Sequence, residues 1–178
     1  MKDWNVVVTA YREGGRQTLR ALRRLGRAET SGHYNVFVAK APDPLEMLEE
    51  LEDRAGAEPA LIETISRIAP AQTCFDYSDQ ADFERKTVEA VQPWLGRLSG
   101  RSFHIRVHRR GSALTETQAE EARLGRLVLA ELTAQGAQGR ISFDDADLVL
   151  SIDVVGLRAG LGLWSRQDLH THHFLRPD

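Results

Sequence analysis

The sequence has a single cysteine and no long apolar run. Cys74 alone can form neither an internal disulfide nor a multi-cysteine zinc site. No apolar run approaches the ~20 residues that a membrane-spanning helix needs. The first ten residues also lack the basic stretch and following apolar stretch of a secretory signal. We therefore expect a protein without a membrane partner, located in the cytoplasm.

Motifs of cofactor chemistry are absent as well. The sequence has no GxxxxGK[ST] phosphate loop and no GxGxxG between a predicted strand and a predicted helix. The histidine and cysteine pattern of the zinc deaminases is missing, and Cys74 fits a buried structural thiol better than a nucleophile. We therefore expect no catalytic residue, no cofactor, no metal and no enzymatic activity. A metal site stays open for three histidines near the C-terminus, which are His170, His172 and His173, and a phosphate contact stays open for His170 and His173.

Lysine is scarce, because 20 of the 23 basic residues are arginines. Arginine forms forked contacts to phosphate and stacks on bases, which lysine does not. A GC-rich genome also favours arginine, so the number alone decides nothing. The 178-residue chain is 42% hydrophobic and 28% charged, as expected for a globular protein with a net charge of only −3. The positions of the arginines therefore matter more than their number.

Predicted strands and helices alternate, which is typical of an α/β or α+β architecture. In chain order, strands are predicted at 4–11, 33–41, 72–77, 102–109, 147–155 and 157–164, and helices at 16–27, 45–55, 59–68, 79–98 and 115–135. Pro93 predicts a kink, and Gly111 ends the strand before it. This order divides the chain into two units, 1–77 and 78–178.

The predicted helix 16–27 carries a first basic surface. At about 100° per residue, five arginines fall on one side of this helix, and they are Arg16, Arg20, Arg23, Arg24 and Arg27. A solvated helix face normally mixes charges of both signs, since like charges at i,i+4 repel each other. Two interpretations stay open: a polyanion contacts this face, or the acidic segment 43–63 neutralises it.

The segment 97–110 carries a second basic surface and contains no acidic residue. Its basic residues are Arg97, Arg101, His104, Arg106, His108, Arg109 and Arg110. The two-residue period of a strand directs Phe103, Ile105 and Val107 to one face, and the basic side chains at even positions to the other. The basic face is either solvated or in contact with RNA phosphates and bases.

The segment from Trp94 to Gly111 resembles the central strand motif of THUMP domains, in which Gly-Lys/Arg-Ser/Thr-Phe follows a helix. The segment Phe143–Asp153, an aspartate followed by a hydrophobic strand, resembles the hairpin of that family, and Gly160–Trp164 fits its last strand. Arg67–Cys74 is similar to the linker that precedes the domain in stand-alone members. The resemblance covers roughly 79–178.

This resemblance implies a ferredoxin-like domain at 1–77, a THUMP domain at 78–178 and tRNA as the partner. Stand-alone members are similar to the adaptor of tRNA cytidine acetylation, which presents tRNA to a separate enzyme. The RNA surface that the resemblance carries over comprises Arg101, His104, Arg106, His108, Arg109 and Arg110. It leaves open whether the tRNA 3′ end is bound.

Three functions remain possible at this point. The first is a non-catalytic adaptor that presents tRNA to a base-modification enzyme. The second is the RNA-targeting subunit of a two-chain tRNA-modifying enzyme. The third is a small-molecule-binding regulatory protein with a ferredoxin-like fold, whose basic faces pair with its own acidic segments.

Overall fold

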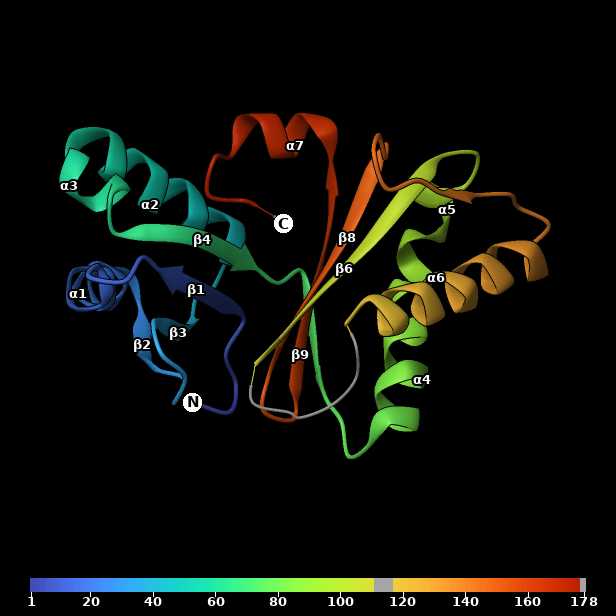
Figure 1. The fold of residues 1–178 in the computed structure, drawn as a ribbon, viewed down its shortest axis with the longest axis horizontal. Coiled ribbons are helices and arrows are strands. Elements are labelled where there is room, and N and C mark those ends of the chain that lie inside the picture. Colours follow the sequence, from blue (N-terminus) through green and yellow to red (C-terminus); the bar gives the residue numbers. More distant parts are fainter. Residues whose placement is uncertain (111–116, 177–178) are drawn as a thin grey trace. The chain divides into compact units, whose positions relative to one another are not determined.

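The computed structural model describes residues 1–110 and 117–176 and contains two separate β-sheets with associated helices (Figure 1). The fold class is therefore α+β, as the alternation of elements predicts. Gly111, the predicted helix start at 115 and the last two residues lie outside the described residues. None of the described helices is both long and apolar enough to cross a membrane. By their internal contacts, the residues form two compact units.

The first unit has the βαββαβ order of a ferredoxin-like fold. Its elements are β1 (Val6–Ala10), α1 (Gly15–Leu25), β2 (Arg27–Thr30), β3 (Val36–Lys40), α2 (Pro44–Ala57), α3 (Pro59–Ile62) and β4 (Ile65–Pro70). The strands pair antiparallel in the order β2-β3-β1-β4. Val8 lies opposite both Phe37 and Ile68, so these three buried side chains share one face of the sheet.

Two strands of this unit differ from the sequence prediction. The predicted helix 59–68 is a single turn, α3, followed by β4, in which Ile65 and Ile68 are buried. β2 was not predicted at all, because Arg27–Thr30 is short and only Ala28 in it is buried. By contrast, α2 forms as predicted: the Asp43 side chain accepts hydrogen bonds from Leu45 N and Glu46 N at its start.

The C-terminal segment Leu169–Arg176 belongs to the first unit, although the sequence predicts a second domain that runs to 178. Ile68 N donates to Phe174 O at 2.9 Å, and Phe174 is 2% exposed. His172 Nδ1 lies 2.8 Å from a carboxylate oxygen of Glu52 on α2. The segment thereby supplies acceptors to the outer edge of β4, which explains why it groups with this sheet.

The second unit comprises Thr73–Asp168 among the described residues. Its strands are β5 (Thr73–Asp76), β6 (Ser102–Arg110), β7 (Arg140–Ile141), β8 (Leu148–Val155) and β9 (Arg158–Ser165), in the order β5-β9-β8-β6-β7. β6 runs parallel to β7 and β8, whereas β9 pairs antiparallel with β5 and β8. Because β5 lies in this sheet, the first unit ends at Gln72 rather than at the predicted residue 77.

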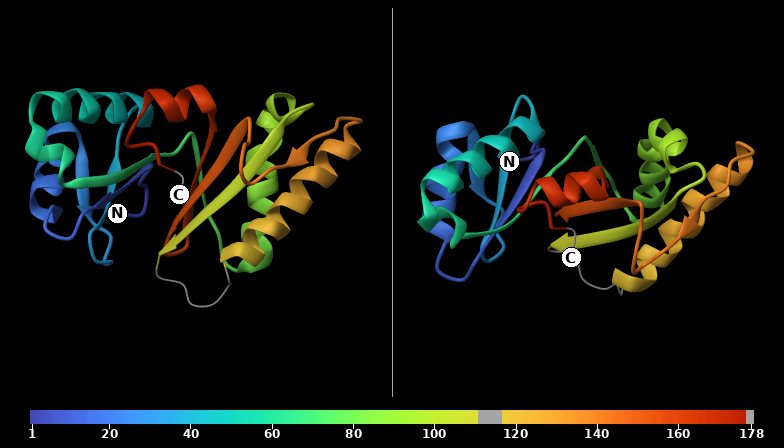
Figure 2. Two further views of the ribbon diagram at one scale, coloured as in Figure 1. Left: turned by 45° about the horizontal axis from the view of Figure 1, so that its top comes forward. Right: turned by 90° about the horizontal axis from the view of Figure 1, so that it is seen from above.

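The helices of the second unit cover one face of its sheet (Figure 2). They are α4 (Gln80–Val91), a 3-10 turn η1 (Gln92–Trp94), α5 (Leu95–Leu98) and α6 (Thr117–Ala134), and α7 (Arg166–Thr171) follows β9. The predicted break at Pro93 is confirmed, since this residue lies within η1. The predicted hairpin is confirmed too. Its turn contains Gly156 with a φ of +63°, a conformation that favours glycine.

Candidate nucleic-acid interface

β6 anchors the second basic surface through its apolar residues. Phe103, Ile105 and Val107 are 0%, 3% and 4% exposed and belong to the core between the sheet and the helices. This confirms the predicted alternation along the strand. The basic side chains next to them do not share one environment, however, and the structure separates them into three groups.

His104 lies in a buried position and not on a solvated face. His104 is 4% exposed, and its ring contacts the ring of Phe143 edge-on at a centroid distance of 5.1 Å. The chain after β7 continues alongside β6, where Ser142 N donates to Phe103 O at 3.0 Å. The predicted contact between His104 and RNA therefore finds no accessible surface, because β6 has neighbours on both sides at this level.

Arg109 is the clearest departure from the predicted RNA surface. Its guanidinium binds Glu120 of α6, with Nη2 at 2.5 Å from Oε1, and donates to Tyr77 Oη at 2.8 Å. It also lies 4.7 Å from the centroid of the Phe83 ring. The side chains of Arg109 and Glu120 are 9% and 1% exposed. The odd-numbered position directs Arg109 to the helix-covered face, where it is an internal cation.

The pKa values of this cluster follow from the same contacts. Burial lowers the pKa of Arg109, but its hydrogen bond to Glu120 and the charge of that carboxylate outweigh burial and raise it above the ordinary value. Burial also raises the pKa of Tyr77, against the opposing charge of Arg109. Tyr77 Oη donates to Gly156 O at 3.0 Å, so its hydroxyl both donates and accepts. Arg109 is thus fully charged and satisfied inside the protein.

Arg106, His108 and Arg110 form a half-buried group further along β6. Arg106 Nη1 is 3.7 Å from Glu121 Oε2, and the other oxygen of that carboxylate accepts from Val107 N at 2.9 Å. Glu121 therefore occupies the open edge of β6 and partly offsets the charge of Arg106. Arg110 Nη1 lies 3.5 Å from Arg109 O. Contact between this group and RNA stays a prediction, and the Glu121 carboxylate reduces the positive charge that the group offers to a phosphate.

A group of exposed cations lies where β6 begins. Arg97, Arg101 and Arg140 are exposed, and no ion pair joins any of them to a carboxylate within 1–110 and 117–176. Gly100, Arg101, Gln138, Gly139 and Arg140 line a hollow of about 170 Å³. Gly100 N donates to Gln138 O at 2.6 Å and Arg140 N to Arg101 O at 3.2 Å, so the backbone holds the two arginines on one rim.

Arg140 is a candidate that sequence reasoning missed. It follows Gly139, at which an added Cβ would lie 2.7 Å from Leu132 Cδ1, so a side chain there would require the Leu132 side chain to move. The only signal in the sequence is an arginine directly after the glycines that end a helix. Its proximity to Arg101 depends on the parallel pairing of β7 with β6, which joins Arg140 to Ser102.

Ser102 and Asp147 fix the start of β6 against β8. Asp147 Oδ2 accepts hydrogen bonds from Ser102 N at 2.9 Å and from its Oγ at 2.7 Å. These bonds, together with the charges of Arg166 and Arg140, lower the pKa of Asp147 below its ordinary value. Arg166 also contacts Asp145 at 2.9 Å. The carboxylate therefore positions the loop that carries Arg101.

The first basic surface comprises four arginines of α1 and Arg27, the first residue of β2, and these five are likewise not equivalent. All five are exposed. Arg23 Nε donates to Ala28 O at 3.2 Å, and Arg27 Nη2 lies 2.5 Å from Asp3. In the part of the chain that the structure describes, no ion pair forms at Arg16, Arg20 or Arg24.

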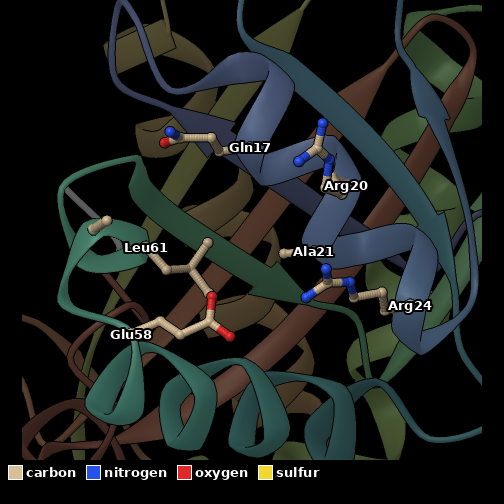
Figure 3. Close-up of a pocket in the computed structure, with 7 residues that line it drawn as sticks. Gln17, Arg20, Ala21, Arg24, Glu58 and Leu61 are labelled. Carbon is tan, nitrogen blue, oxygen red and sulfur yellow. The ribbon is translucent and has the colours of Figure 1, made fainter.

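Within the described residues, the acidic segment 43–63 therefore forms no direct ion pair with Arg16, Arg20 or Arg24. Arg20, Arg24 and Gln17 line one side of a hollow of about 180 Å³, with Glu58 and Leu61 on the other side. The Arg24 side chain and the Glu58 carboxylate extend into it from opposite sides (Figure 3). Glu58 belongs to the acidic segment and approaches the arginines without pairing with them.

The C-terminal histidines do not assemble a metal site. His172 contacts Glu52, and His173 lies against the ring of Phe174 with a centroid distance of 5.6 Å. Across the described ranges, no group of three or more His, Cys, Asp or Glu side chains is arranged to hold a metal ion. The Cys74 side chain is half-buried on β5 and not fully buried as predicted.

Comparisons with known proteins identify the fold. No family model and no curated protein matches the sequence. Three solved structures match 89%, 89% and 90% of this chain with TM-scores of 0.62, 0.60 and 0.56: PH1313 from Pyrococcus horikoshii Ot3, TrmN from Thermus thermophilus, and a 4-thiouridine synthetase in complex with RNA and ATP. The identities are 14%, 18% and 16%, and the chain spans 53%, 44% and 41% of those proteins. The protein therefore shares its two-unit fold with parts of larger proteins, one of which binds RNA.

Proposed function

We propose that the protein binds tRNA through the exposed arginines at the start of β6 and presents it to a base-modification enzyme on another chain. The observation that carries this proposal is a group of three exposed arginines, Arg97, Arg101 and Arg140, none of which forms an ion pair with a described carboxylate. Arg101 and Arg140 also line one hollow. Guanidinium groups bind phosphate through forked hydrogen bonds, and neutralised phosphates release counterions.

The resemblance to THUMP domains supports the same surface. The Gly100–Phe103 segment that carries the resemblance ends α5 and begins β6, and Asp147 of the second motif holds Ser102. A fold shared with a synthetase that was solved in complex with RNA adds support for RNA as the ligand. The hollow beside Arg101 has a volume of about 170 Å³ and two arginines on its rim, and we propose the tRNA 3′ end as its occupant.

The adaptor role is a proposal that rests on absent motifs and not on a catalytic site. The chain has neither a phosphate loop nor a dinucleotide motif, so we propose that catalysis resides in a separate modification enzyme. Incubation of the purified protein with tRNA and either S-adenosylmethionine or ATP tests this. Turnover by the chain alone would refute the adaptor role and leave RNA binding intact.

One observation favours a competing function. Arg109 with Glu120, and Arg106 near Glu121, are the internal pairs expected of a small-molecule-binding regulatory protein. Filter-binding titration with total tRNA, with and without its 3′ CCA, separates the two functions. We expect an affinity that falls steeply with salt and weakens when the CCA is removed. No binding to tRNA at 50 mM salt would favour the regulatory protein.

A further inference from the structure

A second cationic surface lies on the first unit, and nothing in the motif that resembles THUMP domains accounts for it. Arg16, Arg20 and Arg24, here called the α1 arginine row, follow each other at intervals of four residues and therefore share one helix face. All three are exposed, and none forms an ion pair with a described carboxylate. Arg23 of the same helix and Arg27, the first residue of β2, have partners within the unit.

The α1 arginine row destabilises the helix on which it lies. Like charges at i,i+4 repel each other, and α1 has no acidic residue in its first turn, where the helix dipole favours one. The N-cap residue Gly14 supplies no side-chain hydrogen bond either. The buried face of α1 consists of Thr18, Ala21 and Leu22, so the arginines add nothing to the core. A local arrangement that opposes stability is expected where function requires it.

The geometry of the row matches a ligand with regularly repeated negative charge. A rise of 1.5 Å per residue places successive members about 6 Å apart along the helix axis. The phosphates of a nucleic acid strand repeat along a line, whereas carboxylates on a folded partner protein are scattered. The acidic segment of this chain illustrates the difference, because Glu58 faces Arg20 and Arg24 across a hollow and pairs with neither.

We propose that the α1 arginine row binds consecutive backbone phosphates of an RNA strand, independently of base sequence. This site is separate from the cluster at the start of β6, and the proposal rests on the RNA-binding function proposed above. Gln17 lies in the same hollow as Arg20 and Arg24, and its amide can donate to a phosphate or accept from a ribose hydroxyl. Glu58 opposes the incoming phosphates and limits the affinity.

The test compares two triple variants with equal changes in charge. The first is Arg16→Gln, Arg20→Gln, Arg24→Gln. The control is Arg27→Gln, Arg85→Gln, Arg123→Gln, whose arginines are 67%, 57% and 61% exposed and pair with Asp3, Asp82 and Glu84. Affinity for total tRNA and for a 20-nucleotide oligouridine is measured at several salt concentrations, and circular dichroism confirms that each variant is folded.

We expect the row variant to bind oligouridine at least tenfold more weakly, with a logarithmic salt slope shallower by about 2, since each single-strand contact contributes about 0.7. The control should stay within twofold of the wild type. Glu58→Gln should strengthen binding, because it removes the one carboxylate in the hollow. A tighter complex with polyglutamate than with oligouridine at equal salt would assign the row to an acidic protein and overturn the proposal.

The remaining outcomes separate this proposal from the function above. If Arg101→Glu, Arg140→Glu weakens tRNA binding while the row variant binds like the wild type, the row is not an RNA site and the proposed function stands. If the wild type binds oligouridine through the row but shows no preference for tRNA, the row is an RNA site and the tRNA function fails. If the wild type binds neither RNA, both proposals are wrong.

Discussion

Exchange of Arg109 for methionine tests whether this residue is an internal cation or a contact to RNA. The change keeps most of the apolar stem but leaves the Glu120 carboxylate, 1% exposed, without its cation. Gln80 Nε2, at 3.1 Å, is then the remaining side-chain donor to Glu120 Oε1. Breaking a buried pair in this way costs about 3–5 kcal/mol. At about 2–4 °C per kcal/mol for a chain of this size, the melting temperature should fall by roughly 6–20 °C.

The double variant Arg109→Met, Glu120→Leu provides the matched control. It removes both charges together, so no unpaired carboxylate remains in the core. Replacement of a buried ion pair by apolar residues is often neutral or stabilising by about 1–4 kcal/mol, so the double variant should recover most or all of the loss. Urea denaturation measures the free energy of unfolding for the wild type and both variants, and tRNA titration below each transition measures affinity.

The two interpretations of Arg109 differ in both measurements. An internal cation predicts lost stability in the single variant, recovery in the double variant, and an unchanged affinity of the folded protein for tRNA. A phosphate contact predicts the opposite: near-normal stability and affinity reduced in both variants. A single variant as stable as the wild type but with tenfold weaker tRNA binding would therefore refute the reasoning from the structure and restore the prediction from the sequence.

Three further predictions concern the second unit. Arg101→Glu, Arg140→Glu should weaken tRNA binding more than tenfold and make the salt slope shallower by up to about 1.8, at an unchanged melting temperature; an unchanged slope would exclude them as phosphate contacts. Phe103→Ala should cost about 3–5 kcal/mol through a cavity, with tRNA binding lost only as the protein unfolds; weaker binding by the folded variant would contradict this. The lowered pKa of Asp147 means that its contribution is complete above the unfolded pKa of about 3.9 and is lost as the pH falls towards the folded value. Asp147→Asn should therefore lose stability less steeply than the wild type below pH 4 in acid titrations of unfolding, and parallel curves would show that the Ser102 contact is not linked to protonation.

Elements with strong local periodicity could be predicted from the sequence. The alternation of Phe103, Ile105 and Val107, the hairpin around Gly156 and the break at Pro93 each depend on a few neighbouring residues. β2 and β7 could not be predicted, because β2 has one buried side chain among its four residues and β7 has only two residues. β7 exists through pairing with β6, which lies about forty residues earlier in the chain. The return of Phe174 to the edge of β4 depends on a hydrogen bond between residues far apart in the chain, which no local pattern shows.

The candidate site could be predicted only in part, because it too depends on contacts between residues far apart in the chain. The sequence indicates where cations accumulate, but an arginine becomes available to a ligand only where no acid of the fold neutralises it. Glu120 and Glu121 lie on α6, more than ten residues after Arg109 and Arg106, and their proximity to β6 follows from packing of the helix on the sheet. Counting acids within 97–110 therefore overestimates the free charge of that surface.

The same reasoning separates the arginines of α1 and the start of β2, where charge along the chain suggested one uniform face. Asp3 precedes the first strand and reaches Arg27, whereas the eight-acid segment that seemed the natural partner leaves Arg20 and Arg24 without an ion pair. What distinguishes the arginines proposed to contact RNA on both units is thus not their number or spacing. It is that the fold leaves them exposed and without an ion pair to a described carboxylate, whereas Arg109, Arg106 and Arg27 each have an anion supplied by another segment of the chain.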